Sequence, residues 1–236
     1  MLDFTRFKVL TFDCYGTMID WETGIFSAMR PILAAHDKKI TDSALLELYS
    51  ELELAAESSA EKGQFVRYRD VLQFVVRGFG QRLGFKPTDA EIRSLPESLA
   101  NWQPFPDTVE ALRKLKSHYQ LAVISNVDDD LFATTAPKLG VAFDQVITAQ
   151  QAGCYKPCMK IFELAEKLMG VSREQWLHVG QSIYHDVIPA QSLGLATVWV
   201  NRPSPRPGAG AAKAAAGKPD LDVPNLQSLA DLAVGG

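Results

Sequence analysis

A short apolar run near the N-terminus, which ends abruptly in polar residues, constrains the fold more than any other feature. Lys8 to Phe12 (KVLTF) is rich in strand-favouring residues, and Asp13 and Gly16 end it. Such a run predicts a strand buried on both faces. Similar runs recur at 121–124 (LAVI), 145–148 (QVIT), 176–179 (WLHV) and 196–200 (ATVWV). Because helical patterns separate these runs, the chain is predicted to be an α/β protein with a parallel sheet.

Two of the intervening helices carry end signals. Asp107 is followed three residues later by Glu110, which predicts a helix that starts at Asp107. A second helix is predicted from about Met159 to Met169, where Gly170 stands in position to terminate it. Gly194 is expected to close a third helix in the same way.

A long stretch between the first two predicted strands shows helical periodicity only. Apolar residues recur there with helical spacing, for example at Leu45, Leu48 and Leu52. We therefore predict an all-helical cap over residues 21–103, inserted into an α/β core formed by residues 1–20 and 104–236.

The segment PSPRPGAGAAKAAAGKP, residues 203–219, is low in complexity. Its Pro, Gly and Ala content predicts a mobile surface loop. An Ala-rich helix is the alternative, which the flanking prolines and glycines disfavour.

Composition narrows the class of function. The 236 residues carry a net charge of −4 and no dense Lys/Arg cluster, so neither nucleic acid nor membrane is an expected partner. No apolar stretch approaches the length needed to span a bilayer. The three cysteines cannot all pair internally, which suits a reducing compartment, and a cytoplasmic protein is expected.

Polar residues follow the predicted strands at the edge where ligands bind in open parallel sheets. They are Asp13 with Tyr15 and Thr17, Ser125 with Asn126, Lys156, and Gln181 with Ser182 and Asp186.

These residues fall into four ordered motifs, DCYGT (13–17), SN (125–126), YKP (155–157) and GQSIYHD (180–186), which resemble those of the haloacid dehalogenase superfamily. The resemblance covers essentially the whole chain, and it implies a Rossmann-like core with a helical cap inserted after the first strand. FDCYGTMIDWETGI (12–25) looks most like the 2-haloacid dehalogenase branch. It is also similar to a relative that opens the ring of azetidine-2-carboxylate.

By this resemblance Asp13 is the expected nucleophile, which forms a covalent ester with the substrate. Lys156 would keep the Asp13 carboxylate charged, as a weak nucleophile requires. Asp186 would orient Lys156 or activate the hydrolytic water. Thr17 and Ser125 complete the catalytic set.

The resemblance also implies a set of substrate contacts. Asn126 and Ser125, with backbone amides near Cys14 to Thr17, would bind the substrate carboxylate and the oxyanion of ester hydrolysis. Ser182 is a further expected contact. Tyr15 and Trp102 are expected to form apolar walls around a small acid.

Two positions separate reaction types within the superfamily. Its phosphatases carry a second aspartate two residues after the nucleophile and an acidic residue in the fourth motif, where this chain has Tyr15 and Gln181. Phenol and amide groups leave few hard anionic ligands for magnesium, so no metal and no cofactor is expected. Substitution at carbon is therefore favoured over phosphoryl transfer.

The sequence departs from the pattern of the 2-haloacid dehalogenases at the residue that receives the leaving group. The 2-haloacid dehalogenases hold the departing halide with an arginine in the cap, and Ser50 stands near the matching place here. Arg69 is the best substitute by position, and Arg67 fits less well by helical spacing. If neither reaches the site, a strained ring nitrogen becomes the better leaving group.

The expected function is hydrolysis of a carbon–halogen or similar carbon–heteroatom bond in a small 2-substituted carboxylic acid. The alternatives are an azetidine-2-carboxylate-type hydrolase, a phosphatase of the same superfamily and a non-catalytic relative that binds a small acid. His178 reads as a core histidine, and the role of His185 stays open. A homodimer is compatible with this reading, although the sequence leaves the oligomeric state open.

Overall fold

The computed structural model describes residues 2–61, 65–202 and 210–235. Within them lies a six-stranded parallel sheet with the strand order β3-β2-β1-β4-β5-β6. The strands are β1 (Val9–Phe12), β2 (Gln120–Ser125), β3 (Gln145–Thr148), β4 (Trp176–Gly180), β5 (Ala196–Val200) and β6 (Leu221–Val223). Strand order reverses at β1, whose neighbours are β2 and β4. The predicted α/β class and parallel sheet are confirmed.

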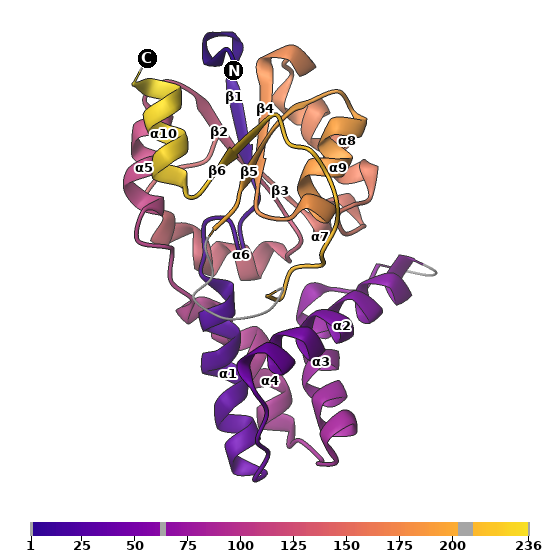
Figure 1. The fold of residues 1–236 in the computed structure, drawn as a ribbon. Helices are drawn as coiled ribbons and strands as arrows, with labels where there is room; N and C mark the ends of the chain where they lie inside the picture. The colour runs from indigo at the N-terminus through magenta and orange to yellow at the C-terminus, as the bar shows by residue number, and fades with distance from the viewer. Residues whose placement is uncertain (1, 62–64, 203–209, 236) are drawn as a thin grey trace.

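Helices cover both faces of the sheet and form a separate group beyond one of its ends (Figure 1). The core helices are α5 (Thr108–Lys116), α6 (Asp129–Thr135), α7 (Ala149–Ala152), α8 (Met159–Met169), α9 (Ile188–Ser192) and α10 (Leu226–Val234). The separate group comprises α1 (Trp21–Ala35), α2 (Asp42–Glu61), α3 (Tyr68–Leu83) and α4 (Asp89–Ser98). Short helical turns are η1 (Phe4–Arg6), η2 (Leu99–Asn101), η3 (Ala136–Leu139), η4 (Arg173–Gln175) and the π-helical η5 (Ile183–Val187).

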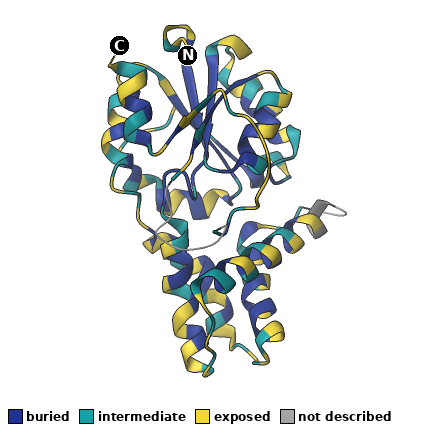
Figure 2. Ribbon diagram, in the orientation of Figure 1, coloured by how far each residue is buried: buried dark blue, intermediate teal, exposed yellow. Residues whose placement is uncertain are grey.

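Alternate side chains of each strand pack into different layers. Leu121 and Val123 of β2 join a cluster that includes α5 and α10, whereas Ala122 and Ile124 pack with α8 and α9. The strands β1, β2, β4 and β5 are mostly dark blue in Figure 2 because both of their faces are covered. This burial explains why the strands read as continuous apolar runs.

The four helices α1–α4 are an inserted helical cap. Its two connections to the core run side by side, because Ile19 bridges to Pro104 and Asp20 N–H donates to the Gln103 carbonyl at 2.9 Å. The cap therefore enters and leaves the core next to the end of β1. No described helix is both long enough and apolar enough to cross a bilayer.

Most helix ends agree with the sequence predictions. Helix α8 spans the predicted residues, and Gly170 ends it in the left-handed conformation. Helix α5 begins directly after Asp107, but the Asp107 side chain makes no capping hydrogen bond. It instead pairs with Arg202 at 2.9 Å, so the capping explanation was wrong.

The described part of the low-complexity segment is a loop, as predicted, with one buried contact. Residues 203–209 lie outside the described residues, and residues 210–219 contain no helix. Ala211 is buried, and its N–H donates to Glu22 Oε1 of α1 at 3.0 Å. Ala211 therefore packs against the cap, whereas residues 213–218 lie exposed on the surface.

Candidate active site

The main candidate site is a pocket between the carboxyl ends of the central strands and cap helix α2. The neighbouring strands β2, β1 and β4 end here, at the reversal of strand order where open α/β sheets bind ligands. The lining residues are Asp13, Tyr15, Trp21, Ser50, Glu53, Leu54, Glu57, Tyr68, Ser125, Asn126, Lys156, Gln181, Ser182, His185, Asp186, Ala211, Ala212 and Lys213.

Lys156 joins the two carboxylates of the predicted catalytic set. Its Nζ donates to Asp13 Oδ1 at 2.8 Å, to Asp186 Oδ1 at 2.6 Å and to the Ile124 carbonyl at 3.0 Å. All three ammonium protons are thereby used, and the side chain is only 1% exposed. Lys156 is therefore fixed in place, with its charge directed at Asp13 and Asp186.

Burial and neighbouring charges shift the pKa values of Lys156 and Asp13 in opposite directions. Burial favours a neutral lysine, but the adjacent Asp13 and Asp186 carboxylates outweigh it and raise the pKa of Lys156. Burial is the largest effect at Asp13, and it raises the pKa of that carboxyl despite the opposing charge of Lys156. A desolvated carboxylate beside one fixed cation is a stronger nucleophile than a solvated one.

Thr17 holds the second oxygen of Asp13. Its hydroxyl donates to Asp13 Oδ2 at 2.8 Å and accepts the Gln181 N–H at 2.9 Å. The Thr17 carbonyl in turn accepts from the Arg202 guanidinium at 2.8 and 3.0 Å. Thr17 therefore orients Asp13 and links the loop after β1 to the loop after β4.

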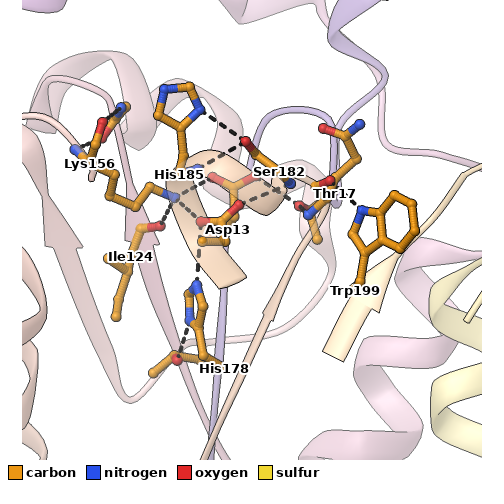
Figure 3. A network of polar contacts seen from close by, with 12 residues as sticks. Asp13, Thr17, Ile124, Lys156, His178, Ser182, His185 and Trp199 are labelled. Carbon is orange, nitrogen blue, oxygen red and sulfur yellow. Dashed lines mark hydrogen bonds and ion pairs between the residues drawn. The ribbon is translucent and has the colours of Figure 1, made fainter. Parts of the chain in front are cut away.

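Asp186 lies at the end of a buried chain of polar contacts that runs through β1 and β4. Figure 3 shows His178, a member of this chain, in one polar network with Asp13 and Lys156. Trp176 Nε1 donates to Thr11 Oγ1 at 2.7 Å, and Thr11 Oγ1 lies 2.8 Å from His178 Nδ1. His178 Nε2 lies 3.3 Å from Asp186 Oδ1. An ionised Asp186 can only accept, so Nε2 carries the proton of this bond, and the Thr11 hydroxyl, which already accepts from Trp176, can donate its own proton to Nδ1.

This series of hydrogen bonds, together with Lys156, keeps Asp186 ionised. Burial favours the neutral acid, yet Lys156 and the hydrogen bond from His178 lower the pKa of Asp186 below its ordinary value. Oδ1 accepts from both of these groups, and Oδ2 accepts from Ser182 N–H at 3.2 Å. The contacts of Asp186 suit the orientation of Lys156 better than the activation of water. His178 was expected to be a plain core residue, and its link to Asp186 was missed because nothing in the sequence shows that the two are close.

Ser125 and Asn126 both line the pocket, but their polar groups are used differently. Ser125 Oγ is buried and has no hydrogen-bond partner among the described residues. The Asn126 amide instead binds the Lys156 backbone, accepting from its N–H at 2.6 Å and donating to its carbonyl at 3.2 Å. Ser125 is therefore free to meet a ligand, whereas Asn126 chiefly holds the Lys156 loop.

Ser182 and His185 form the wall that follows β4. Ser182 Oγ accepts the His185 N–H at 3.1 Å and lies 3.0 Å from His185 Nδ1. His185 Nε2 is buried and lacks a partner among the described residues. Burial lowers the pKa of His185 to about 4, so the ring is neutral at pH 7 and can take part in proton transfer.

Of three predicted contacts near the loop after β1, Tyr15 lines the pocket, whereas the side chains of Trp102 and Cys14 do not. The Tyr15 hydroxyl lies 3.0 Å from Thr135 Oγ1, away from the carboxylates. Trp102 packs edge-on against Tyr15 at 5.7 Å between ring centroids and does not line the pocket. The buried Cys14 side chain does not line it either. Trp102 is therefore corrected to a packing position, whereas the expected substrate contact of the backbone amide near Cys14 stays a prediction.

Arg69 does not line the pocket. Its guanidinium pairs with Asp130 at 2.7 Å, and Arg67 pairs with Asp130 at 3.0 Å. Helix α3 begins beside Asp128, whose carboxylate accepts the Tyr68 and Arg69 backbone N–H groups at 3.0 Å. The start of α3 thus turns both arginines towards α6, so neither takes the place of the missing halide-binding arginine.

Three charged residues of the pocket were not among the predicted site residues. Glu53 and Glu57 face it from α2, and Lys213 faces it from the segment after β5, where Nζ lies 3.7 Å from the centroid of the Tyr184 ring. Glu53 and Glu57 lie four residues apart on one helix face, which is a signal the sequence contained. Lys213 lies in a low-complexity segment and had no such signal.

No group of three or more His, Cys, Asp or Glu side chains within residues 2–61, 65–202 and 210–235 is arranged to hold a metal ion. Gln181 stands in the pocket wall where an acidic ligand would be needed. Trp199 Nε1 donates to the Gln181 carbonyl at 2.7 Å and fixes this loop.

The chain is similar in sequence to known hydrolases. An (S)-2-haloacid dehalogenase, H-109 of Pseudomonas putida, is 27% identical over 196 residues, which cover 82% of this chain and 85% of that protein. A glyceraldehyde 3-phosphate phosphatase of Methanothermobacter thermautotrophicus is 31% identical over 198 residues, covering 82% and 85%.

A solved structure with the same fold is that of a defluorinating L-2-haloacid dehalogenase. It has a TM-score of 0.83 and 21% identity, and the match covers 98% of this chain and 96% of that one. The family model for haloacid dehalogenase-like hydrolases matches residues 7–194. The chain therefore belongs to the haloacid dehalogenase-like hydrolase family.

Proposed function

We propose that this protein hydrolyses a carbon–halogen or similar carbon–heteroatom bond in a small 2-substituted carboxylic acid through an ester of Asp13. The observation that carries the proposal is the buried array in which Lys156 joins Asp13 to Asp186 beside the unpartnered Ser125 hydroxyl. Similarity to (S)-2-haloacid dehalogenases supports this substrate class.

In the first step, an oxygen of Asp13 attacks C2 of the substrate, and the leaving group departs with the electron pair of the broken bond. Thr17 and Lys156 hold the carboxylate in one orientation, which lowers the entropic cost of attack. Ser125 Oγ is the free donor for the substrate carboxylate.

In the second step, water cleaves the ester at the Asp13 carbonyl carbon and restores the carboxylate. Asp186 keeps Lys156 in place so that its ammonium stabilises the negative charge that develops on the ester oxygen. His185, neutral and with an unpartnered ring nitrogen in the pocket wall, is available to hydrogen-bond that water and orient it.

Residues 21–103 serve in this scheme as the cap that covers Asp13, with residues 1–20 and 104–236 as the catalytic core. Closure against α2 would exclude bulk water, which the reactivity of a carboxylate requires. Phosphoryl transfer is disfavoured because Tyr15 and Gln181 stand where an acidic residue would supply a proton or bind magnesium.

The position of Arg69 supports ring opening at a strained C–N bond as the second candidate. Arg69 and Arg67 are paired with acidic residues outside the pocket, and no arginine is among the described residues that line it to receive a departing halide. A ring nitrogen needs a proton rather than a cation when it leaves.

A substrate panel with isotope labelling tests the proposed function. The purified protein is given 2-chloropropionate, fluoroacetate and azetidine-2-carboxylate with excess chelator, with Asp13→Asn as the control. Single turnover in oxygen-18 water should place the label in the Asp13 carboxylate. Label found only in the product, or full activity of Asp13→Asn, would refute the covalent mechanism, and magnesium-dependent phosphate release from a phenyl phosphate would favour a phosphatase.

A further inference from the structure

The cap side of the pocket is acidic. Helix α2 contributes Ser50, Glu53, Leu54 and Glu57, whose spacing of three and four residues places them on one helix face. Glu53 and Glu57 are 8% and 6% exposed, so both carboxyl groups are largely removed from bulk water. Buried carboxyl groups are rare unless something binds or uses them.

Hydrogen bonds to Glu53 leave one of its oxygens available. Tyr49 and Tyr68 both donate to Oε1, at 2.9 and 2.6 Å. Within the described chain, no residue donates a hydrogen bond to Oε2. The two phenols thus fix the orientation of the carboxyl group and leave its second oxygen for a ligand in the pocket.

A second observation shows that this pocket is built for a polar ligand. Ser125, 1% exposed, lines the same pocket from the core side, and its hydroxyl has no partner among the described residues. His185 Nε2 is likewise buried without a described partner in the same wall. A polar ligand that satisfies Ser125 would therefore lie between the core and the acidic cap face.

The charges in this pocket disfavour an anion as the leaving group. Among the described lining residues, the cations are Lys156, already bound to two carboxylates, and the exposed Lys213. A departing halide on the cap side would meet the carboxyl groups of Glu53 and Glu57, which supply no positive charge and repel an anion strongly whenever they are ionised where water is excluded. A nitrogen or oxygen that receives a proton as it departs avoids this repulsion.

We propose that Glu53 is the general acid of this enzyme and that its substrate is a small carboxylic acid whose leaving atom is nitrogen or oxygen. This inference rests on the proposed function, because it requires Asp13 to attack C2. As the Asp13 oxygen bonds to C2, the bond from C2 to the leaving atom breaks, and its electron pair moves to that atom. The proton of Glu53 Oε2 moves to the same atom. Water then cleaves the ester, and the proton it releases restores Glu53, so the net reaction adds one water.

The ionisation of Glu53 suits this role. Burial raises its pKa to about 7 against the opposing hydrogen bonds from Tyr68 and Tyr49, so both protonation states are populated near neutral pH. Tyr49 donates to Glu53 from outside the pocket, and the other titratable and charged groups that line the pocket with it are Glu57, Tyr68, Asp13, Tyr15, Lys156, His185, Asp186 and Lys213.

Glu53→Gln tests the inference because it keeps the size of the side chain and an acceptor for both phenols. We expect kcat for azetidine-2-carboxylate, whose leaving atom is nitrogen, to fall at least roughly 100-fold. Release of chloride from 2-chloropropionate, which needs no proton, should change less than roughly threefold. The wild-type kcat for the nitrogen substrate should also decline above about pH 7, and Glu53→Gln should lack that limb.

Glu47→Gln is the matched control, since Glu47 is exposed on the same helix and accepts from Ser43. It should leave both activities unchanged. Equal losses on both substrates in Glu53→Gln, or no loss on either, would overturn the inference.

The wild-type substrate preference separates this inference from the proposed function. Turnover of 2-chloropropionate with label in Asp13, but none of azetidine-2-carboxylate, overturns the role of Glu53 and leaves the covalent mechanism standing. Turnover without label in Asp13 overturns the proposed function itself.

Discussion

Replacement of His178 by phenylalanine should weaken both the fold and the ionisation of Asp186. The ring nitrogens of His178 bond Thr11 Oγ1 at 2.8 Å and Asp186 Oδ1 at 3.3 Å, and the side chain is 1% exposed. Phenylalanine fits a buried strand but offers neither bond. Thr11 would retain its bond from Trp176 but lose the acceptor for its own proton.

The magnitude follows from the kind of hydrogen bond that is lost. A hydrogen bond to a charged group contributes about 1.5–3 kcal/mol, and the lost acceptor for Thr11 adds about 1 kcal/mol. The free energy of unfolding should therefore fall by about 2–4 kcal/mol at pH 7. At 1.36 kcal/mol per unit, loss of the donor should raise the pKa of Asp186 by roughly one to two units.

The pH dependence has a definite sign. Because folding lowers the pKa of Asp186, its ionisation stabilises the protein above the unfolded value of about 3.9, and this contribution disappears as pH falls through the folded value. In His178→Phe the pKa of Asp186 in the folded state moves towards its value in the unfolded state. The difference in stability from wild type should therefore be largest near neutral pH and should shrink in acid.

Urea unfolding followed by tryptophan fluorescence from pH 8 down to about pH 2 measures both effects, because folding lowers the pKa of Asp186 below its ordinary value, and kcat over the same range reports on Asp186. His178→Gln is the matched control, because its amide can still donate to Asp186. It should recover a large part of the stability and of the pH profile. If His178→Phe matches wild type in stability and in the acid limb of kcat, the proposed coupling of His178 to Asp186 is wrong.

Three further changes probe other parts of the site. Because burial raises the pKa of Glu53 in the folded state, the free energy of unfolding of wild type should fall by about 3 kcal/mol as pH rises from about 4.5 to 7. Glu53→Gln should not show this fall, and urea unfolding at pH 5 and pH 8 measures it. Lys213→Met should raise KM for an anionic substrate by roughly threefold to tenfold with little change in kcat, whereas Lys218→Met, on the same segment but outside the pocket, should not. Gly180→Ala should destabilise the protein by about 1–3 kcal/mol and lower kcat, because its Cβ would lie 2.4 Å from Asp186 Cγ; an unchanged unfolding curve would contradict this packing argument.

Local patterns predicted the framework because burial on both faces makes each central strand a continuous apolar run. Three of these runs, those of β1, β2 and β4, lie within a residue of the observed strand ends, and the runs of β3 and β5 match their strands fully. Strand β6 was missed, since three residues after a low-complexity segment give too short a pattern. The polar residues after the strands were identifiable for the same reason, because parallel strands bring their carboxyl ends to one edge.

Tertiary structure alone decided which of those residues share a pocket. Asp128 anchors the start of α3 and turns Arg69 towards Asp130, an arrangement that joins residues about 60 positions apart and leaves no local signal. The contact of His178 with Asp186 and the packing of Ala211 on the cap are of the same kind. The sequence by itself determined Asp13 and its neighbours at the strand ends, since strand periodicity is a local property. The acidic face opposite them, and with it the choice of leaving group, depends on how the cap packs over the core.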